Sequence, residues 1–183
     1  MKKLVLLTTL KFLGIICKAQ ESPSKLDVRF SFGTSLLGTG DIQIFMIKNE
    51  LNLRLSKYWT VSGGLGYAKT ISDIFETGSF IQANTNIYIS PFKNDGNNDF
   101  RLGTGLSWYT FSDIYQSSAT YQNGQLIYQE YEFDNRKSIG VNVIIENTYL
   151  LSSKYMIGIK LFSQPYKNGD LNSGILLKFG AKI

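Results

Sequence analysis

Residues 45–56, FMIKNELNLRLS, alternate between two kinds of side chain. The odd positions are apolar except for Asn49, whereas the even positions from Lys48 onward are charged or polar. Successive side chains of a β-strand point to opposite faces, so an alternation with period two is typical of a strand with one apolar face and one polar face. The segment therefore predicts a strand that separates a dry environment from a wet one.

The same alternation continues on both sides of this segment. No stretch after residue 20 carries the sustained apolar stripe of an amphipathic helix, which recurs at every third or fourth residue. Seven further strands are predicted, at 26–36, 59–71, 81–90, 100–112, 137–151, 155–164 and 171–183. This strand content is too high for an ordinary soluble domain, whereas the strand lengths suit a tilted crossing of a bilayer.

The polar faces of these strands are too charged to line a dry ligand pocket, because burying unpaired charges is costly. The opposite faces together form an apolar surface larger than a soluble monomer exposes, and lipid would cover it. An open sheet edge in hydrocarbon would leave backbone groups unpaired. We therefore predict an all-β fold, a closed eight-stranded antiparallel up-and-down transmembrane β-barrel. Its enclosed face is expected to hold an ion-pair network of Arg29, Lys48, Glu50, Arg54, Arg101, Glu146, Lys160 and Lys178.

Composition limits the chemistry of the chain. It has no His and a single Cys, at position 17, which excludes His-based catalysis, zinc sites built from His or several Cys, and an internal disulfide. We expect no catalytic residue, no metal ligand and no cofactor, and hence no enzyme. Eight strands enclose a lumen just wide enough for side chains, so a narrow passive channel is the first alternative. A soluble lipocalin-like periplasmic binder is the second.

The first 19 residues predict a secretory signal peptide. Two lysines precede an apolar run, and the small residues Cys17 and Ala19 stand at the −3 and −1 positions of a cut before Gln20. A transmembrane helix and a lipoprotein cut at Cys17 are the alternatives. Four of the 19 basic residues lie in this stretch, so the rest of the chain is nearly neutral and no nucleic-acid partner is expected. Residues 20–183 form the predicted barrel, in the outer membrane of a Gram-negative cell and in contact with its lipid.

Two further patterns support a membrane barrel. Short links near 57–58, 93–99 and 153–154 alternate with the segments 38–41, 73–79, 113–136 and 167–170, as expected for periplasmic turns and outer loops. Aromatic residues fall near the predicted strand ends, where they would form two interfacial girdles. The predicted girdle residues are Tyr58, Trp59, Phe92, Phe100, Tyr149 and Tyr155 at the lower end, and Tyr67, Phe80, Trp108, Tyr109 and Tyr166 at the upper end. Random placement in a chain that is 14% aromatic is the alternative.

Residues 113–136 form the longest connection. Asn123-Gly124 is the signature of a type I′ hairpin, so the two flanking strands are expected to continue beyond the membrane as a ribbon. Tyr121, Tyr128 and Tyr131 are its candidate contact residues, because Tyr combines a flat apolar body with a polar tip. The expected partner is an envelope protein or a glycan, and an exposed ribbon edge could also pair with a partner strand. A passive solvated loop is the alternative.

Three segments of the chain resemble a known family. These are Ala19-Gln20 at the end of the signal, the hairpin sequence NELNLRLSKY at 49–58 with its continuation GGLGY at 63–67, and the last five residues, FGAKI. They look like the small outer-membrane β-barrel domain family of the OmpA/OmpX type. The resemblance implies assembly by the barrel-assembly machinery, which reads the last strand. It also implies a structural, adhesive or accessory subunit of an envelope complex, without the peptidoglycan-binding domain of larger relatives.

Overall fold

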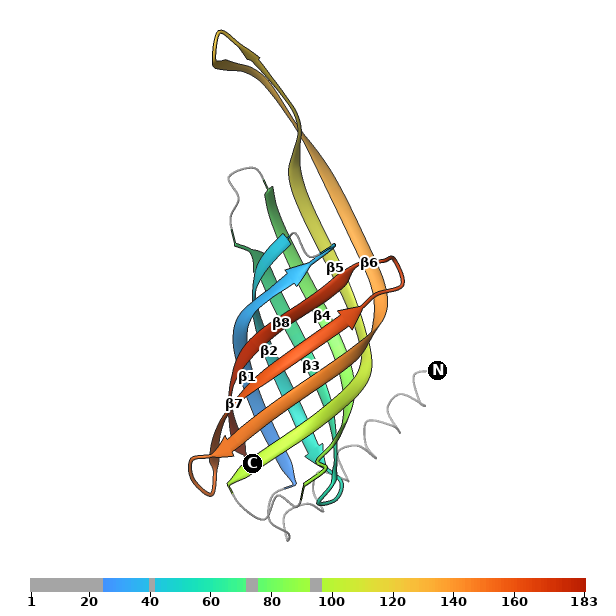
Figure 1. The fold of residues 1–183 in the computed structure, drawn as a ribbon, viewed down its shortest axis with the longest axis vertical. Coiled ribbons are helices and arrows are strands. Elements are labelled where there is room, and N and C mark those ends of the chain that lie inside the picture. Colours follow the sequence, from blue (N-terminus) through green and yellow to red (C-terminus); the bar gives the residue numbers. More distant parts are fainter. Residues whose placement is uncertain (1–24, 40–41, 72–75, 93–96) are drawn as a thin grey trace, which may run out of the picture.

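The computed structural model describes residues 25–39, 42–71, 76–92 and 97–183, and the predicted signal peptide at 1–19 lies outside these ranges. The described chain forms eight β-strands, drawn in Figure 1. They are β1 (Leu26–Leu37), β2 (Ile42–Arg54), β3 (Trp59–Thr70), β4 (Glu76–Ile89), β5 (Asn98–Gln122), β6 (Gln125–Leu150), β7 (Tyr155–Pro165) and β8 (Leu171–Lys182). None of the described residues belongs to a helix that could span a membrane.

The strands close into a barrel. Each strand pairs antiparallel with the next in sequence, and β1 pairs with β8 through a register that places Phe30 beside Phe179. The two ends of the barrel chain meet as well, because the amide of Ile183 donates to the carbonyl of Leu26 at 3.0 Å. The predicted closed eight-stranded antiparallel up-and-down barrel is confirmed.

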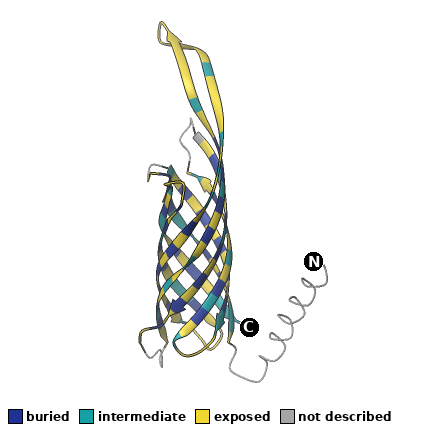
Figure 2. Cartoon of the chain, turned by 90° about the vertical axis from the view of Figure 1, so that its right-hand side faces the viewer, coloured by how far each residue is buried: buried dark blue, intermediate teal, exposed yellow. Residues whose placement is uncertain are grey.

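The sidedness of the strands follows the alternation of the sequence. Along β2, Ile47 and Leu51 are exposed on the outer surface, whereas Lys48 and Glu50 between them are buried in the lumen. In Figure 2 exposed and buried residues alternate along the strands all around the barrel. The apolar half of each strand therefore faces outward and the charged half is enclosed, as predicted.

The enclosed face is not polar throughout, which the alternation alone did not predict. Toward the end of the barrel where β1 ends and β2 begins, the lumen holds an apolar cluster that includes Ile44, Met46, Phe80, Phe111 and Leu176, all buried. In β2 the inward positions thus change from Ile44 and Met46 to charged residues further along the strand. A lumen this narrow is filled by side chains along its length, and toward this end a substantial part of the filling is apolar.

β5 and β6 continue past the barrel as a two-stranded ribbon that projects far beyond the other strands, as Figure 1 shows. The ribbon turns at Asn123 and Gly124, whose φ angles are 53° and 78°. Two consecutive residues with positive φ are the requirement of a type I′ turn, so the predicted hairpin is present. The spans 100–112 and 137–151 were predicted for the barrel itself, and their expected continuation as a ribbon is present, since β5 and β6 extend without interruption to the turn.

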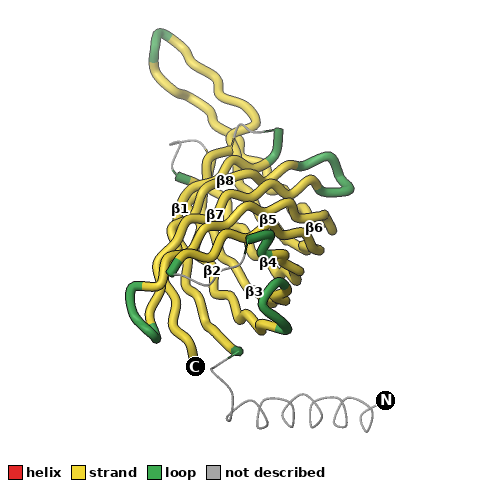
Figure 3. Tube along the Cα trace, turned by 60° about the horizontal axis from the view of Figure 1, so that its bottom comes forward, coloured by secondary structure: helices red, strands yellow, loops and turns green. Residues whose placement is uncertain are grey.

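Two turns at the opposite end of the barrel share one geometry (Figure 3). In the β2–β3 turn the amide of Trp59 donates to Ser56 Oγ at 3.1 Å, and in the β6–β7 turn the amide of Tyr155 donates to Ser152 Oγ at 3.1 Å. The amides of Leu55 and Leu151 donate to the backbone carbonyls of Trp59 and Tyr155, respectively, each at 2.9 Å, and these hydrogen bonds close the two turns. Both turns carry a Leu-Ser pair, at 55–56 and 151–152, and the serine anchors each turn in the same way.

Candidate functional site

A layer of buried charges crosses the lumen in its lower half, the half at the end where the chain terminates. Glu50, on β2, accepts hydrogen bonds from the ammonium groups of Lys160 and Lys178. Lys178 also donates to Glu146 Oε2 at 2.6 Å, so it links the two carboxylates. Every member is at most 1% exposed. The alternation of β2, β6, β7 and β8 brings these residues together, because each one occupies an inward position.

Two arginines complete this layer around Glu146. Arg101 donates to Glu146 Oε1, and its guanidinium lies 4.6 Å from the ring centre of Tyr88. Arg29 donates to the same carboxylate oxygen at 2.5 Å and to Thr148 at 3.0 Å. We call Arg29, Glu50, Arg101, Glu146, Lys160 and Lys178 the lumenal charge network. Charge-assisted hydrogen bonds of this kind offset much of the cost of burying the charges.

Two of the residues predicted for this network lie outside it. Lys48 is buried, but it has no ion pair among the described residues, and its Nζ lies 5.3 Å from the ring centre of Phe162. The side chain of Arg54 is 43% exposed and pairs with Asp99 at 3.0 Å at the mouth of the barrel. The prediction placed both in the network because they share the inward face of β2 with Glu50. The face that a residue occupies does not determine its height along the barrel axis.

A second layer of uncharged polar side chains lies above the charges, and sequence reasoning did not single it out. Gln82 Nε2 donates to Ser107 at 2.8 Å and to the hydroxyl of Tyr166 at 2.7 Å, and it also bonds Gln164. The available signal was the run of inward-facing amides on β4, including Asn84 and Asn86. These alternate with outward apolar residues in the sequence as regularly as the charges do elsewhere.

The aromatic residues divide between the two faces. Trp59, Tyr149 and Tyr155 are exposed on the outer surface at the lower strand ends, where Tyr58 is half-buried in its turn. Tyr67 and Trp108 are exposed nearer the ribbon end.

The assignment of three further aromatics to the upper girdle was wrong. Phe80, Tyr109 and Tyr166 are buried in the lumen, where the ring centres of Tyr109 and Tyr166 lie 4.4 Å apart. Position near a strand end was the criterion for these residues, whereas their parity along the strand places them on the inner face.

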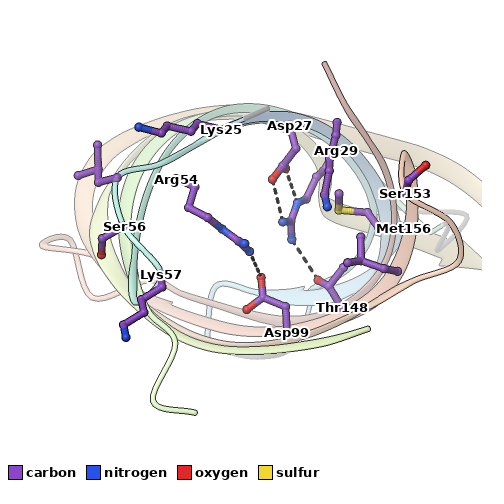
Figure 4. A pocket seen from close by; sticks show the side chains of 13 residues that line it. Lys25, Asp27, Arg29, Arg54, Ser56, Lys57, Asp99, Thr148, Ser153 and Met156 are labelled. Carbon is purple, nitrogen blue, oxygen red and sulfur yellow. Dashed lines mark hydrogen bonds and ion pairs between the residues drawn. The ribbon is translucent and has the colours of Figure 1, made fainter. Parts of the chain in front are cut away.

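A cavity of about 760 Å³ opens at the lower mouth of the barrel (Figure 4). Arg54 reaches across this mouth to Asp99, and Arg29 is held by Asp27 through contacts of 2.6 and 3.0 Å. Both guanidinium groups are therefore neutralised by a nearby carboxylate. Lys25 and Lys57 also line the cavity, but in Figure 4 their ammonium groups point away from its centre.

A smaller cavity of about 390 Å³ lies at the upper mouth, where the ribbon leaves the barrel. Arg136, on β6, is central to it. It pairs with Asp134 at 3.1 Å and with Asp170 at 3.4 Å, and it stacks 4.9 Å from the ring centre of Phe111. Arg136 thus ties the base of the ribbon to the β7–β8 turn. In the described parts of the chain, no group of His, Cys, Asp and Glu side chains is placed to hold a metal ion.

The ribbon has two different faces, because cross-strand partners share a face. One face continues the outer surface of the barrel and carries Ile114 beside Phe133 and Gln116 beside Tyr131. The other continues the lumenal side, which we call the acidic face. It carries Tyr115, Ser118 and Thr120 on β5, and Tyr128, Glu130, Glu132 and Asp134 on β6.

The predicted contact tyrosines do not form a single cluster. Tyr128 lies on the acidic face and Tyr131 on the other one, whereas Tyr121 follows a register shift near the turn, and all three are exposed. Tyr115, which sequence reasoning did not select, donates its hydroxyl to Glu132 at 2.9 Å. That hydrogen bond to a carboxylate raises the pKa of Tyr115, because it favours the protonated phenol.

The fold is that of small bacterial outer-membrane barrels. Neisserial surface protein A aligns with a TM-score of 0.62 at 11% identity, covering 88% of this chain and 98% of that one. Ail, the attachment invasion locus protein of Yersinia pestis, aligns at 0.56 and 8%, covering 86% and 97%. OprG of Pseudomonas aeruginosa aligns at 0.56 and 9%, covering 87% and 96%. A further structure holds Ail in complex with the heparin analogue sucrose octasulfate.

At such low identity these structures establish the shape of the barrel, and a role does not follow from them. No protein-family model matches the sequence. No curated protein matches it either.

Proposed function

We propose that this chain is a non-enzymatic β-barrel of the bacterial outer membrane that serves a structural, adhesive or accessory role and contacts its partner through the ribbon. The observation that carries the membrane location is the sidedness of the barrel. Apolar side chains such as Phe45, Leu65 and Val143 are exposed around the outside, while the charges are enclosed. A soluble lipocalin-like binder needs the opposite arrangement.

The lumen supports a structural role. Charged, amide and apolar layers follow one another along it, and each is built from side chains that contact one another across the barrel. An ion that passed through would have to displace the lumenal charge network. A passive channel is therefore disfavoured.

The ribbon supports a contact role. It projects beyond the barrel with Tyr121, Tyr128 and Phe133 exposed (Figure 2), and it contributes nothing to the filling of the lumen. Amphipathic aromatic side chains on a rigid hairpin suit binding to another molecule. The Ail complex with a heparin analogue is the precedent among similar folds for an anionic glycan partner, but residues 112–135 contain no Lys or Arg. We therefore favour a protein partner.

Two measurements test this function. Membrane fractionation with a gel shift on heating should place the full chain in the outer membrane as a closed barrel, and recovery in the soluble fraction would contradict the location. Deletion of residues 117–131 should preserve the heat-dependent gel shift, because this segment lies outside the barrel, while removing any partner that co-purifies in mild detergent. An unchanged set of partners would contradict the contact role.

A further inference from the structure

The acidic face of the ribbon carries uncompensated negative charge. Residues 112–135 contain four acidic residues and no Lys or Arg. Glu130 and Glu132 are exposed, and their carboxylates accept hydrogen bonds from hydroxyl groups, Ser118 Oγ at 3.4 Å and Tyr115 Oη at 2.9 Å. In the described structure neither carboxylate has a cationic neighbour within 4.0 Å. The face is therefore built to attract a cation from outside this chain.

The acidic residues lie on the strand whose outer edge is open. β7 pairs with β6 only as far as Val143, and isolated contacts of the β7–β8 turn reach Gly140 and Ile139. Beyond these, no described strand pairs with the outer edge of β6. β6 carries no extra residue between Tyr128 and Lys137, whereas β5 carries one at Ser117 and β6 carries one at Ile127, just before this segment. Edge strands are usually protected by Lys, Pro or a bulge, and none of these lies within 128–136 of β6.

Charge selects among the possible occupants of this edge. Glu130, Glu132 and Asp134 alternate along β6 and so project from one face at intervals of about 6.8 Å. A second copy of this chain would bring the same carboxylates opposite its own, which is unfavourable in a cross-strand pair. An extended segment with a basic residue at every second position would place each cation beside one carboxylate.

We propose that the β6 edge between Tyr128 and Arg136 binds an extended cationic polypeptide segment of another protein, with Lys or Arg at alternate positions. This inference rests on the proposed contact role of the ribbon and specifies the partner. Backbone pairing along the edge supplies the contact, as in other β-strand additions. The spacing of Glu130 and Glu132 favours segments that carry Lys or Arg at alternate positions.

The test uses the full chain in zwitterionic detergent micelles and fluorescently labelled peptides, with binding followed by anisotropy. The first peptide alternates Lys and Thr, KTKTKTKT, and the second has the same composition with its Lys residues in adjacent pairs, KKTTKKTT, so that no two of them are two positions apart. The alternating peptide should bind about two- to threefold more tightly, since it alone places Lys beside both Glu130 and Glu132 and the additional cross-strand charge pair is worth about 0.5 kcal/mol. A third peptide, the alternating sequence N-methylated at every amide so that neither of its edges can donate to a strand, should bind no better than the second one.

Two variants separate charge from structure. Glu130→Gln with Glu132→Gln should abolish the preference for the alternating peptide, whereas Glu130→Asp with Glu132→Asp should retain it. Equal binding of both peptides, or a preference that survives the Gln variant, would overturn the proposal. If the 117–131 deletion removes a co-purifying partner that the Gln variant keeps, the contact role stands and the cationic partner is wrong. If the deletion removes no partner, the contact role itself fails.

Discussion

Arg29 on β1 and Glu146 on β6 meet across the lumen, with Arg29 Nη1 at 2.5 Å from Glu146 Oε1, although 117 positions separate them in the sequence. Only closure of the barrel brings these two strands face to face. The same carboxylate also binds Arg101 and Lys178. Glu146 is thus the point at which three strands besides its own are held together through their side chains.

Loss of the Glu146 carboxylate should be strongly destabilising. Glu146→Gln leaves three buried cations without their shared anion, and breaking one partner of a buried ion pair costs about 3 kcal/mol or more. The free energy of unfolding, measured by urea titration in detergent micelles, should fall by that amount. Glu132→Gln in the solvent-exposed ribbon is the matched control and should change it by less than about 0.5 kcal/mol. Equal stability of the two variants would contradict a structural network.

Replacement of Lys48 and of Lys178 by Met should have different effects on the free energy of unfolding. Lys48 is buried without an ion pair among the described residues, so Lys48→Met removes an uncompensated charge and should leave the free energy of unfolding unchanged or raise it by about 1 kcal/mol. Lys178 joins Glu50 to Glu146, so Lys178→Met should lower it by about 3 kcal/mol. A comparable loss in both variants would mean that Lys48 has a compensating anion in solution.

These charges also show how far the sequence alone could lead. Alternation placed Arg29, Glu50, Arg101, Glu146 and Lys160 on the enclosed face, because the period of a strand is fixed by backbone geometry. Alternation carries no information on height within the barrel. Height is set by the stagger between neighbouring strands, such as the register that pairs Arg101 with Glu146.

The apolar cluster in the upper lumen escaped the sequence analysis for a related reason. Where inward and outward positions are both apolar, as at Phe45 and Met46, the pattern no longer distinguishes the two faces. The extent of the ribbon was obscured in the same way. Its strands expose both faces to solvent, so residues 113–136 carry no sustained apolar alternation, and the Asn123-Gly124 turn was the signal that indicated a hairpin.

The filled lumen predicts an absence of steady conductance. Reconstituted in planar bilayers, the full chain should give no reproducible single-channel steps, because the charged layer and the apolar cluster both obstruct the path. Conductance steps of constant size would contradict this and would favour the channel alternative. Protein that has first passed the heat-dependent gel shift provides the control, since it shows that the barrels tested are closed.

Close strand packing predicts a sharp difference between two glycines. A Cβ on Gly105, which faces the lumen, would lie 2.0 Å from the backbone oxygen of Thr85, so Gly105→Ala requires a movement of β4 or β5. A Cβ on Gly63 would meet nothing within 4 Å. Gly105→Ala should lower the free energy of unfolding by about 2 kcal/mol, and Gly63→Ala should change it by less than about 0.5 kcal/mol. Urea titration in micelles would show both effects, and a fully stable Gly105→Ala variant would contradict this strand packing.

The hydrogen bond between Tyr115 and Glu132 predicts a pH response in the ribbon. The contribution of this hydrogen bond to the stability of the ribbon depends on the protonated phenol. It is therefore present below the ordinary pKa of Tyr, near 10, and is lost as the pH rises through the higher pKa of Tyr115 in the folded protein. Glu132→Gln removes the carboxylate and should bring the pKa of Tyr115 down toward its ordinary value, because ionisation no longer places two negative charges side by side. An NMR titration of chain labelled with ¹³C at the Tyr ζ carbons would follow this residue, with Tyr115→Phe used to assign its signal. Tyr121, which lies near the tip of the ribbon and away from Glu132, serves as the internal reference, and an unchanged Tyr115 titration in Glu132→Gln would show that the bond does not form in solution.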